Sequence, residues 1–408
     1  MPTQICCIAP NIFGFTGGIQ IYTRNLLERF KVILPEAQYT TLLKYDRPVD
    51  VANTSVPIPG VHFYCFGQWP RQVQTAMMTL TLLWLAFRHP HMLFIATHVN
   101  YAKALWVAKR LFKIRYWVVA HGLEVWNIET GLLQTALRQA DNIAAVSQYT
   151  RQRLIQEQAI SADRIHILVN TFDGERFQIA PKPVHLLQQH GLRPEQKVIL
   201  TVCRLGGESP LYKGYEHIIR VLPQLKEHFP DIQYVLVGKG SDLKRIQQLV
   251  QALNLQDNVI LTGFVSDEDL PAYYNLCDVF AMPSTGEGFG IVYLEALSSG
   301  KPVLAGNQDG AIDPLLNGEL GCLVNPSDRA EILTQLLAIL QGHYPNHHLY
   351  QPEYLREQAI AHFSINQFQA QLCSLLQHQG IANVVSDSSL TAAAKPEPCE
   401  SALKSPMR

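Results

Sequence analysis

Residues 283–304 read PSTGEGFGIVYLEALSSGKPVL, and this stretch guides the interpretation of the whole chain. An apolar run, Val279–Ala281, precedes it and is expected to form a strand. A helix is expected to begin near Gly290 and Ile291. Glycines between a strand and a helix let backbone N–H groups approach a phosphate, and the positive end of the helix dipole favours the anion. The stretch therefore predicts a phosphate-binding loop at the carboxyl end of a parallel strand.

Two carboxylates accompany this loop, Glu287 just before the helix and Glu295 within it. Eight helical residues rise about 12 Å at about 1.5 Å each, whereas the carboxylate pairs of glycoside hydrolases lie about 5–9.5 Å apart. The spacing favours carboxylates that bind hydroxyl groups on opposite sides of a diphosphate, one on a transferred sugar and one on a ribose. The alternative is an ordinary glycine turn with two surface glutamates.

The surrounding chain alternates short apolar runs with amphipathic segments, which is typical of parallel sheets covered by helices. One series of strands runs from Ile5–Ala9 to Ile143–Val146, and a second from Val198–Val202 to Val303–Ala305. A polar stretch over 173–196 separates them. We therefore predict an α/β protein with two Rossmann-like domains facing across a cleft, in which ligands bind at the carboxyl ends of the strands.

The boundaries of these domains follow from the same pattern. We expect a first domain at 1–178, a second domain at 190–345 and a helical segment at 350–380 whose last helix returns to the first domain. Residues 383–408 are rich in Ser, Ala, Pro and Lys and are expected to be disordered.

Composition excludes several classes of protein. The 408-residue chain holds 33 Lys+Arg and 34 Asp+Glu, a net charge of -1, which argues against a nucleic-acid-binding protein. Residues 1–180 hold 17 basic and 11 acidic side chains (net +6), and the remainder 16 and 23 (net -7). A basic half can favour anionic ligands or an anionic membrane. The alternative is that these charges are solvated surface residues without a binding function. The cysteines lack metal-binding spacing and the start lacks a signal-peptide pattern, so we expect a reduced, cytoplasmic protein.

Two apolar segments of the first half bear on membranes. The longest apolar run, Val73–Phe87, is 15 residues, shorter than the about 20 needed to span a bilayer, and is expected to be a buried helix. The second segment is a helix expected over 102–113, in which the basic residues and Trp106 lie on the same side of the helix. The opposite arc is expected to pack on the sheet and comprises Ala104, Val107, Ala108, Leu111 and Phe112. A Trp among basic residues can hold a protein on anionic lipid at the membrane periphery. A face that is simply solvated explains the pattern as well as membrane binding does. The basic residues near Trp106 and Trp117 are Lys103, Lys109, Arg110, Lys113 and Arg115.

The segment Glu287–Glu295, EGFGIVYLE, resembles the signature of the family 4 retaining glycosyltransferases, which have the GT-B fold. Other motifs follow the family's order over nearly the whole chain apart from its tail. The resemblance implies that the domain at 1–178 binds the acceptor and that the domain at 190–345 binds the nucleotide-sugar donor. The resemblance implies that Glu287 contacts hydroxyls of the donor sugar and that Glu295 binds the nucleotide ribose. It also implies that donor-binding groups lie at Phe289, Gly290, Ile291 and Val292.

Two cations upstream complete this half of the proposed site. Residues 201–214, TVCRLGGESPLYKG, place Arg204 at a strand end and Lys213 nine residues later. Two such cations can bind one diphosphate and stabilise the charge that develops on a leaving group. They resemble the family's phosphate-binding Arg and Lys, although alone they would usually be a surface pair.

The first half holds the other candidates. Residues 13–18, FGFTGG, follow the first strand but lack the GxGxxG spacing of dinucleotide enzymes. The resemblance assigns Gly17 and Gly18 to a loop that closes over the donor diphosphate and the acceptor. His121 ends the strand Tyr116–Ala120, and its match to the family's His-Gly implies a contact near the reacting centre of the donor. A lone histidine is more often structural.

Weaker candidates lie at other strand ends. His98 is a candidate for acceptor binding, and Ser147 and Asn170 occupy family-like positions. Val265, in the turn Gly263-Phe264-Val265, resembles a residue whose backbone reads the nucleotide base. Asp267-Glu268-Asp269 is formally an Asp-x-Asp metal motif, but acids in the first turn of a helix explain it better, so no metal site is expected.

These observations predict a retaining glycosyltransferase that uses a nucleotide-diphosphate sugar, either GDP-mannose or a UDP-sugar, as co-substrate and needs no other cofactor. The acceptor would be a carbohydrate or a lipid-linked hydroxyl. HGLEVW at 121–126 resembles a form found in some mannosyltransferases and favours GDP-mannose. The alternatives are a nucleotide-sugar epimerase of the same architecture and a non-catalytic subunit that binds a nucleotide sugar. The expected catalytic residues are His121, Arg204, Lys213 and Glu287.

Overall fold

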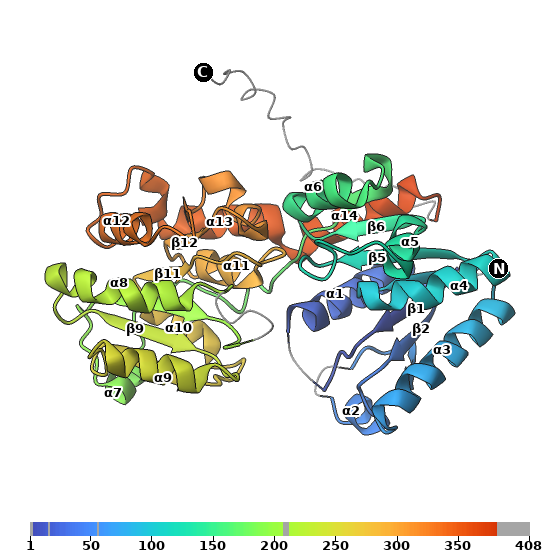
Figure 1. Ribbon diagram of the computed structural model, residues 1–408, viewed down its shortest axis with the longest axis horizontal. Helices are drawn as coiled ribbons and strands as arrows, with labels where there is room; N and C mark the ends of the chain where they lie inside the picture. Colours follow the sequence, from blue (N-terminus) through green and yellow to red (C-terminus); the bar gives the residue numbers. More distant parts are fainter. Residues whose placement is uncertain (1–2, 15–16, 55–56, 207–211, 382–408) are drawn as a thin grey trace, which may run out of the picture.

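The computed structural model describes residues 3–14, 17–54, 57–206 and 212–381. The tail expected over 383–408 lies outside the described residues. Two parallel sheets, each with helices on both faces, lie side by side (Figure 1). The predicted α/β architecture of two Rossmann-like units is confirmed.

The first sheet contains seven strands in the order β3-β2-β1-β4-β5-β6-β7. All neighbouring strands are parallel. Its central strands are buried and apolar because helices cover both faces. The strands are β1 (Gln4–Ala9), β2 (Gln38–Leu43), β3 (Val61–Cys65), β4 (Leu93–Ala96), β5 (Arg115–Ala120), β6 (Asn142–Ala145) and β7 (Ile165–Ile167). The helices are α1 (Gly18–Ile33), α2 (Pro48–Ala52), α3 (Arg71–Arg88), α4 (Ala102–Phe112), α5 (Leu132–Arg138) and α6 (Gln148–Gln158), with 3₁₀ turns at Val99–Tyr101 and Ala162–Arg164.

The second sheet contains six parallel strands in the order β10-β9-β8-β11-β12-β13. The strands are β8 (Val198–Val202), β9 (Gln233–Val237), β10 (Val259–Gly263), β11 (Val279–Met282), β12 (Val303–Gly306) and β13 (Cys322–Val324). The helices are α7 (Val184–His190), α8 (Tyr215–His228), α9 (Leu243–Ala252), α10 (Leu270–Leu276), α11 (Ile291–Ser298) and α12 (Arg329–Leu340). Short 3₁₀ turns lie at Gly310–Ile312, Leu316–Gly318 and His347–Tyr350.

Three strands were missed by the sequence pattern, and all three lie at sheet edges: β3, β7 and β13. β7 and β13 have only three residues each, and β3 is only half-buried along its length. Edge strands of this kind lack the continuous apolar runs that mark a central strand of a parallel sheet.

The chain ends with two helices that join the domains, α13 (Pro352–Phe363) and α14 (Ile365–His378). Helix α13 packs on α11 of the second domain, and α14 packs on α1 of the first. The ring of Phe368 meets that of Tyr22 edge-on at 5.5 Å, and Gln371 Oε1 accepts a hydrogen bond from Val169 N at 3.2 Å. The expected return of the last helix to the first domain is therefore confirmed.

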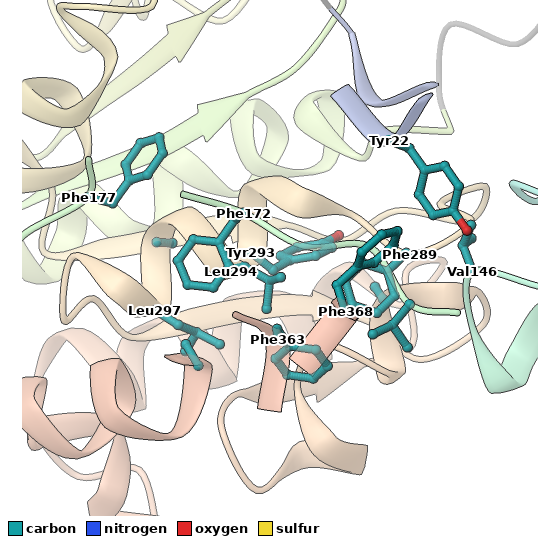
Figure 2. Close-up of a cluster of buried hydrophobic side chains, with 14 of the residues drawn as sticks. Tyr22, Val146, Phe172, Phe177, Phe289, Tyr293, Leu294, Leu297, Phe363 and Phe368 are labelled. Carbon is teal, nitrogen blue, oxygen red and sulfur yellow. The ribbon is translucent and has the colours of Figure 1, made fainter. Parts of the chain in front are cut away.

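A single apolar cluster extends through this junction (Figure 2). It contains Tyr22 and Phe172 from the first half of the chain, Phe289 and Leu294 from the second domain, and Phe363 from α13. The rings of Phe289 and Phe363 lie edge-on at 5.6 Å. The loop that precedes α11 is thus attached to a core shared by both domains.

The run Val73–Phe87 forms α3, but the expectation of a buried helix is wrong. One face, with Met78, Leu82 and Leu85, packs on the sheet. The other face is exposed along its length because α3 lies on the outer side of the first domain, away from the second (Figure 1). Within the described ranges, no helix combines the length and apolarity required to cross a bilayer.

The expected packing of α4 also needs correction. Leu105 and Ala108 face the sheet, whereas Val107 and Leu111, which were expected to pack there, are exposed. Trp106 is only partly exposed. The helix is therefore rotated relative to this expectation, because Leu105 and Ala108 form its buried face. Lys109, expected on the basic arc, forms an ion pair with Asp141 at 2.6 Å.

We expect Phe368→Ala to lower the free energy of unfolding by about 3–5 kcal/mol, since truncating a buried phenylalanine leaves a cavity. Urea titration followed by circular dichroism measures this loss. Asn366→Ala, at an exposed position of the same helix, is the control and should change the free energy by less than about 0.5 kcal/mol. A loss below about 1 kcal/mol for Phe368→Ala would contradict the packing of α14 on the first domain.

Candidate active site

The strand order places a crevice in each sheet. In the second sheet, β8 pairs with both β9 and β11, so the connections after β8 and β11 leave in opposite directions. Ligands of open α/β sheets bind at such a switch point, outside the carboxyl ends of the strands. The segment after β8 carries Arg204 and Lys213, and the segment after β11 carries Glu287. The corresponding switch point of the first sheet lies between β1 and β4, where Gly17 and His98 follow the strands.

A cavity of about 650 Å³ opens at the switch point of the second sheet. Arg204 lines it, and Leu123 of the first domain closes one side. The cavity therefore lies between the domains, as the predicted cleft requires. Its other lining residues are Leu205, Gly206, Tyr212, Lys239, Gly240, Ser241, Thr285 and Gly286.

Lys213 and Glu287 form an ion pair beside this cavity. Only 15% of the Lys213 side chain and 13% of the Glu287 side chain are exposed. Burial lowers the pKa of Lys213 to about 8, and the charge of Arg204 acts in the same direction. Lys213 and Glu287 are thus in contact, and Arg204 is close enough to lower the pKa of Lys213.

The two segments meet through their backbones. Gly214, with φ of +75°, lies so close to Pro283 that a Cβ would be 2.1 Å from the Pro283 carbonyl oxygen. Thr285 N donates a hydrogen bond to Tyr212 O at 2.8 Å. Only glycine fits at position 214, and this contact holds Lys213 next to Glu287.

The first domain reaches the same place through His121 and Gly122. A Cβ on Gly288 would lie 1.5 Å from His121 O, and one on Gly122 would lie 2.6 Å from the Cα of Gly288. The backbones of the two domains therefore touch at the loop that holds Glu287.

The side chain of His121 is held in a neutral form. Its Nε2 lies 3.0 Å from Thr97 O, and because a carbonyl only accepts, Nε2 carries the proton. Burial lowers the pKa of His121 to about 3, outweighing that hydrogen bond. Glu124 Oε1 accepts the His121 backbone N–H at 2.5 Å and fixes the turn. His121 thus holds an uncharged imidazole against the first domain, while its backbone forms the contact with the second.

A second contact between domains lies at the start of α6. The Asp313 carboxylate accepts hydrogen bonds from Gln148 N at 2.7 Å and Tyr149 N at 3.2 Å. Tyr149 Oη donates to Gln308 O at 2.6 Å. A carboxylate at a helix N-terminus satisfies free N–H donors and interacts favourably with the helix dipole. The second domain therefore caps a helix of the first.

Asp309 was missed by sequence reasoning. It is fully buried and accepts hydrogen bonds from Ser284 Oγ at 2.7 Å, Glu287 N at 2.8 Å and Ala311 N at 2.9 Å. Burial raises its pKa to about 7 despite these bonds. Asp309 holds the backbone of Glu287, and its position just after β12, at a strand end, was the available signal.

Asp46 has the same role in the first domain and was also missed. Its carboxylate accepts hydrogen bonds from Ile12 N at 2.6 Å, Phe13 N at 3.1 Å and Gly14 N at 2.7 Å. It thereby holds the loop that leads to Gly17, the N-cap of α1.

The predicted glycine-loop residues lie where helices begin. α1 starts at Gly18 after Gly17, and α11 starts at Ile291 after Gly290, and neither N-cap residue supplies a side-chain capping bond. Backbone N–H donors at such helix starts suit phosphate oxygens. Positions 15–16 of the first loop lie outside the described residues.

Other predicted donor residues stand apart from the cavity lining. Glu295 is buried and accepts a hydrogen bond from Tyr274 Oη at 2.7 Å; burial raises its pKa. Val265 follows Phe264, whose exposed ring lies 4.6 Å from Lys239 Nζ, a cavity-lining residue. The side chain of Phe289 packs in the shared core, so only its backbone can face a donor. Val292 and Ile291 occupy the first turn of α11.

The weaker candidates mainly support local structure. His98 Nδ1 accepts the Asn100 N–H at 3.2 Å, and Ser147 Oγ accepts the Thr150 N–H at 3.0 Å and caps α6. Asn170 is buried, and its amide oxygen has no hydrogen-bond partner among the described residues.

Two of the acidic residues before α10 interact with other residues of the protein. Asp267 pairs with Arg176 at 3.7 Å, and Asp269 Oδ2 accepts a hydrogen bond from Ser266 Oγ at 2.8 Å. Among the residues that the structure describes, no three His, Cys, Asp or Glu side chains are grouped to hold a metal ion.

Two family models match the chain in succession. The model described as Glycosyltransferase Family 4 matches residues 16–176, and the model described as Glycosyl transferases group 1 matches residues 185–358. Together they match most of both domains and leave only residues 177–184 unmatched between them. The chain belongs to the family 4 glycosyltransferases.

Curated relatives of this family 4 protein include mannosyltransferases. A GDP-mannose-dependent alpha-(1-6)-phosphatidylinositol monomannoside mannosyltransferase from Mycolicibacterium smegmatis is 34% identical over 242 residues, which cover 56% of this chain and 61% of that relative. The match thus spans less than two thirds of that relative's length. A phosphatidyl-myo-inositol mannosyltransferase from Mycobacterium leprae is 26% identical over 350 residues, 83% of this chain and 88% of the relative.

Solved structures establish the fold as GT-B. Anabaena HepE in complex with UDP aligns with a TM-score of 0.74 at 21% identity, covering 92% of this chain and 100% of that one. A sucrose-phosphate synthase from Thermosynechococcus elongatus aligns with a TM-score of 0.75 at 20% identity, covering 93% and 99%.

We expect Gly288→Ala to lower kcat/KM of this family 4 protein by about 100-fold, because the added Cβ separates the two domains at the site and small displacements of reacting groups are costly. Steady-state kinetics measure the effect. Gly174→Ala is the control, since its Cβ would meet only side-chain atoms, the nearest at 3.3 Å on Ile360. Wild-type kinetics for Gly288→Ala would show that the domain contact has no part in catalysis.

A pH prediction follows from the pKa of about 8 for Lys213. As pH rises through this value Lys213 loses its charge, so affinity for a nucleoside diphosphate should fall, about tenfold for each pH unit above the pKa. Isothermal titration calorimetry between pH 7 and pH 10 measures this. Lys213→Arg, which stays charged, should shift the fall to higher pH. Asp309 ionises in the wild type and in Lys213→Arg alike, so it cannot account for a difference between them. A pH profile of affinity that is the same in both proteins would show that Lys213 does not bind the diphosphate.

Proposed function

We propose that the protein is a retaining glycosyltransferase that transfers a sugar from a nucleoside diphosphate sugar to an acceptor hydroxyl. The observation that carries this proposal is the group formed by Arg204, Lys213 and Glu287 at a cavity between two domains. Family membership and the relatives named above support transfer rather than epimerisation.

In this proposal, donor binding rearranges the Lys213–Glu287 ion pair. The ammonium group of Lys213 moves its interaction to the diphosphate, joined by the guanidinium group of Arg204. The Glu287 carboxylate then becomes free to accept hydrogen bonds from hydroxyls of the sugar. Each buried charge thereby exchanges one partner for another, which avoids leaving an unpaired charge in a site of low polarity.

The transfer step follows from the charges of the site. The acceptor oxygen forms a bond to the anomeric carbon as the bond from that carbon to the diphosphate oxygen breaks. The leaving diphosphate takes up the electron pair, and on the same face it accepts the proton of the acceptor hydroxyl. Arg204 and Lys213 stabilise the charge that develops on the diphosphate, so the step uses no cofactor beyond the donor. Neutral His121 orients the sugar, and the contact between the domains excludes water.

We propose GDP-mannose as the donor ahead of UDP-sugars. The HGLEVW segment at 121–126 and the GDP-mannose-dependent relatives support this order. A carbohydrate or lipid-linked acceptor, in polysaccharide or glycolipid synthesis at the cytoplasmic face of a membrane, accords with the names of the mannosyltransferase relatives.

The test begins with a thermal-shift panel of GDP-mannose, UDP-glucose and other nucleotide sugars, since a ligand of the folded state raises its melting temperature. Acceptor-dependent release of nucleoside diphosphate is then measured with the best donor. Glu287→Gln and Lys213→Ala should each lower kcat/KM by about 100-fold or more. Glu268→Gln, an exposed acid before α10, is the control and should remain active.

The outcomes separate the alternatives. Turnover near the wild-type value in both variants, with the correct donor and acceptor, would contradict the assignment. Conversion of the donor to its epimer without any acceptor would indicate an epimerase. Donor binding with neither transfer nor hydrolysis would indicate a non-catalytic binding subunit. The anomeric configuration of the product, determined by NMR, tests retention separately.

A further inference from the structure

The outer face of α3 carries a continuous apolar stripe. Leu80 is 61% exposed, Trp84 52% and Phe87 66%, and exposed Val73 and Met77 continue the row toward the start of the helix. At about 100° per residue, these five side chains fall within an arc of about 80°. We call them the α3 stripe. A row of large exposed apolar side chains on one helix face is typical of a surface that binds a protein, a membrane or a ligand.

Helix α4 extends this surface. It runs beside α3 on the outer side of the first domain (Figure 1). The rings of Phe87 and Phe112 meet edge-on at 5.7 Å, so the two helices end close together. Val107 and Leu111 of α4 are exposed, Leu111 by 61%. The apolar surface therefore spans two neighbouring helices.

The segment that forms this surface carries charges of one sign. Residues 51–123 contain no Asp or Glu but seven Lys and Arg. Lys109 is paired with Asp141, whereas Arg88, Lys103, Arg110 and Lys113 are exposed at the ends of α3 and along α4. An apolar stripe on two helices that carry cations and no acidic residues matches an anionic lipid surface, in which acyl chains receive the apolar groups and headgroups receive the charges.

The position of the surface relative to the cleft is also informative. Helix α3 follows β3, so it begins at the carboxyl edge of the first sheet, the edge that faces the cleft. Trp69, 47% exposed, lies just before its first turn. A bilayer on the α3 stripe would therefore extend to the mouth of the cleft.

We propose that the α3 stripe, together with the exposed face of α4, docks on a bilayer that contains anionic phospholipids. The surface binds in the plane of the membrane, with the apolar side chains at the depth of the first acyl carbons and the cations among the headgroups. A second copy of the chain is a poorer occupant, because pairing two such faces brings like charges together with no acidic partner. The proposal concerns a surface apart from the catalytic residues, and binding can be measured without activity.

The test is flotation of the full chain with vesicles of phosphatidylcholine alone or with 30% phosphatidylglycerol. We expect binding to the anionic vesicles that weakens as salt is raised, and at least about tenfold less binding to the neutral ones. Leu80→Gln/Trp84→Gln should lower the partition coefficient by about tenfold or more, and Lys103→Glu/Arg110→Glu should do the same and remove the salt dependence. All four positions are exposed, so the variants should keep the wild-type melting temperature.

Two control variants alter matched side chains elsewhere. Leu132→Gln/Val184→Gln removes two exposed apolar groups, and Lys244→Glu/Arg329→Glu reverses two exposed charges of the second domain; both should bind vesicles as the wild type does. Equal binding to neutral and anionic vesicles, or equal loss in test and control variants, would overturn the proposal. So would a dimer in solution that Leu80→Gln/Trp84→Gln dissociates, with no vesicle binding, since a second copy would then occupy the surface.

Discussion

The backbone of Gly288 lies against that of His121 and Gly122, with no space for a side chain on either glycine, and the candidate site depends on this contact. It brings the loop of Glu287 to the strand end that carries His121, so groups from two separately folded sheets surround one cavity. Two other features also join the domains: the shared apolar core, and Asp313, which caps α6 across the domain boundary. These contacts keep the residues that each domain contributes to the site close together.

Each sheet contributes a glycine-containing loop that a buried aspartate holds in place. Asp46 accepts three backbone N–H groups before α1, and Asp309 fixes the loop before α11. Short loops with closely packed backbones have many N–H donors that neighbouring strands cannot satisfy, and a carboxylate satisfies several at once. The N-cap positions of α1 and α11 are left without side-chain bonds, which suits helix starts that receive an anion.

Much of this arrangement could be predicted from the sequence. The central strands were evident because buried parallel strands are continuous apolar runs. Arg204 was found at a strand end, and Lys213 and Glu287 were found because their glycine-containing segments resemble motifs of the family. Edge strands such as β3 were missed because their half-buried sequences lack that signal. Asp309 was missed because it acts on backbone groups, so its position after a strand was the only signal and no side-chain motif marked it. The exposure of Trp84 was missed because the hydrophobicity of a segment alone does not show which face of a helix packs on the core.

The central claim is that a donor diphosphate takes the place of Glu287 as the partner of Lys213. A crystal structure with a bound nucleoside diphosphate tests this most directly. The account predicts phosphate oxygens within hydrogen-bond distance of both Lys213 Nζ and the Arg204 guanidinium, with the Lys213–Glu287 ion pair broken. A nucleotide bound elsewhere, or bound in the cavity with that ion pair intact, would contradict it.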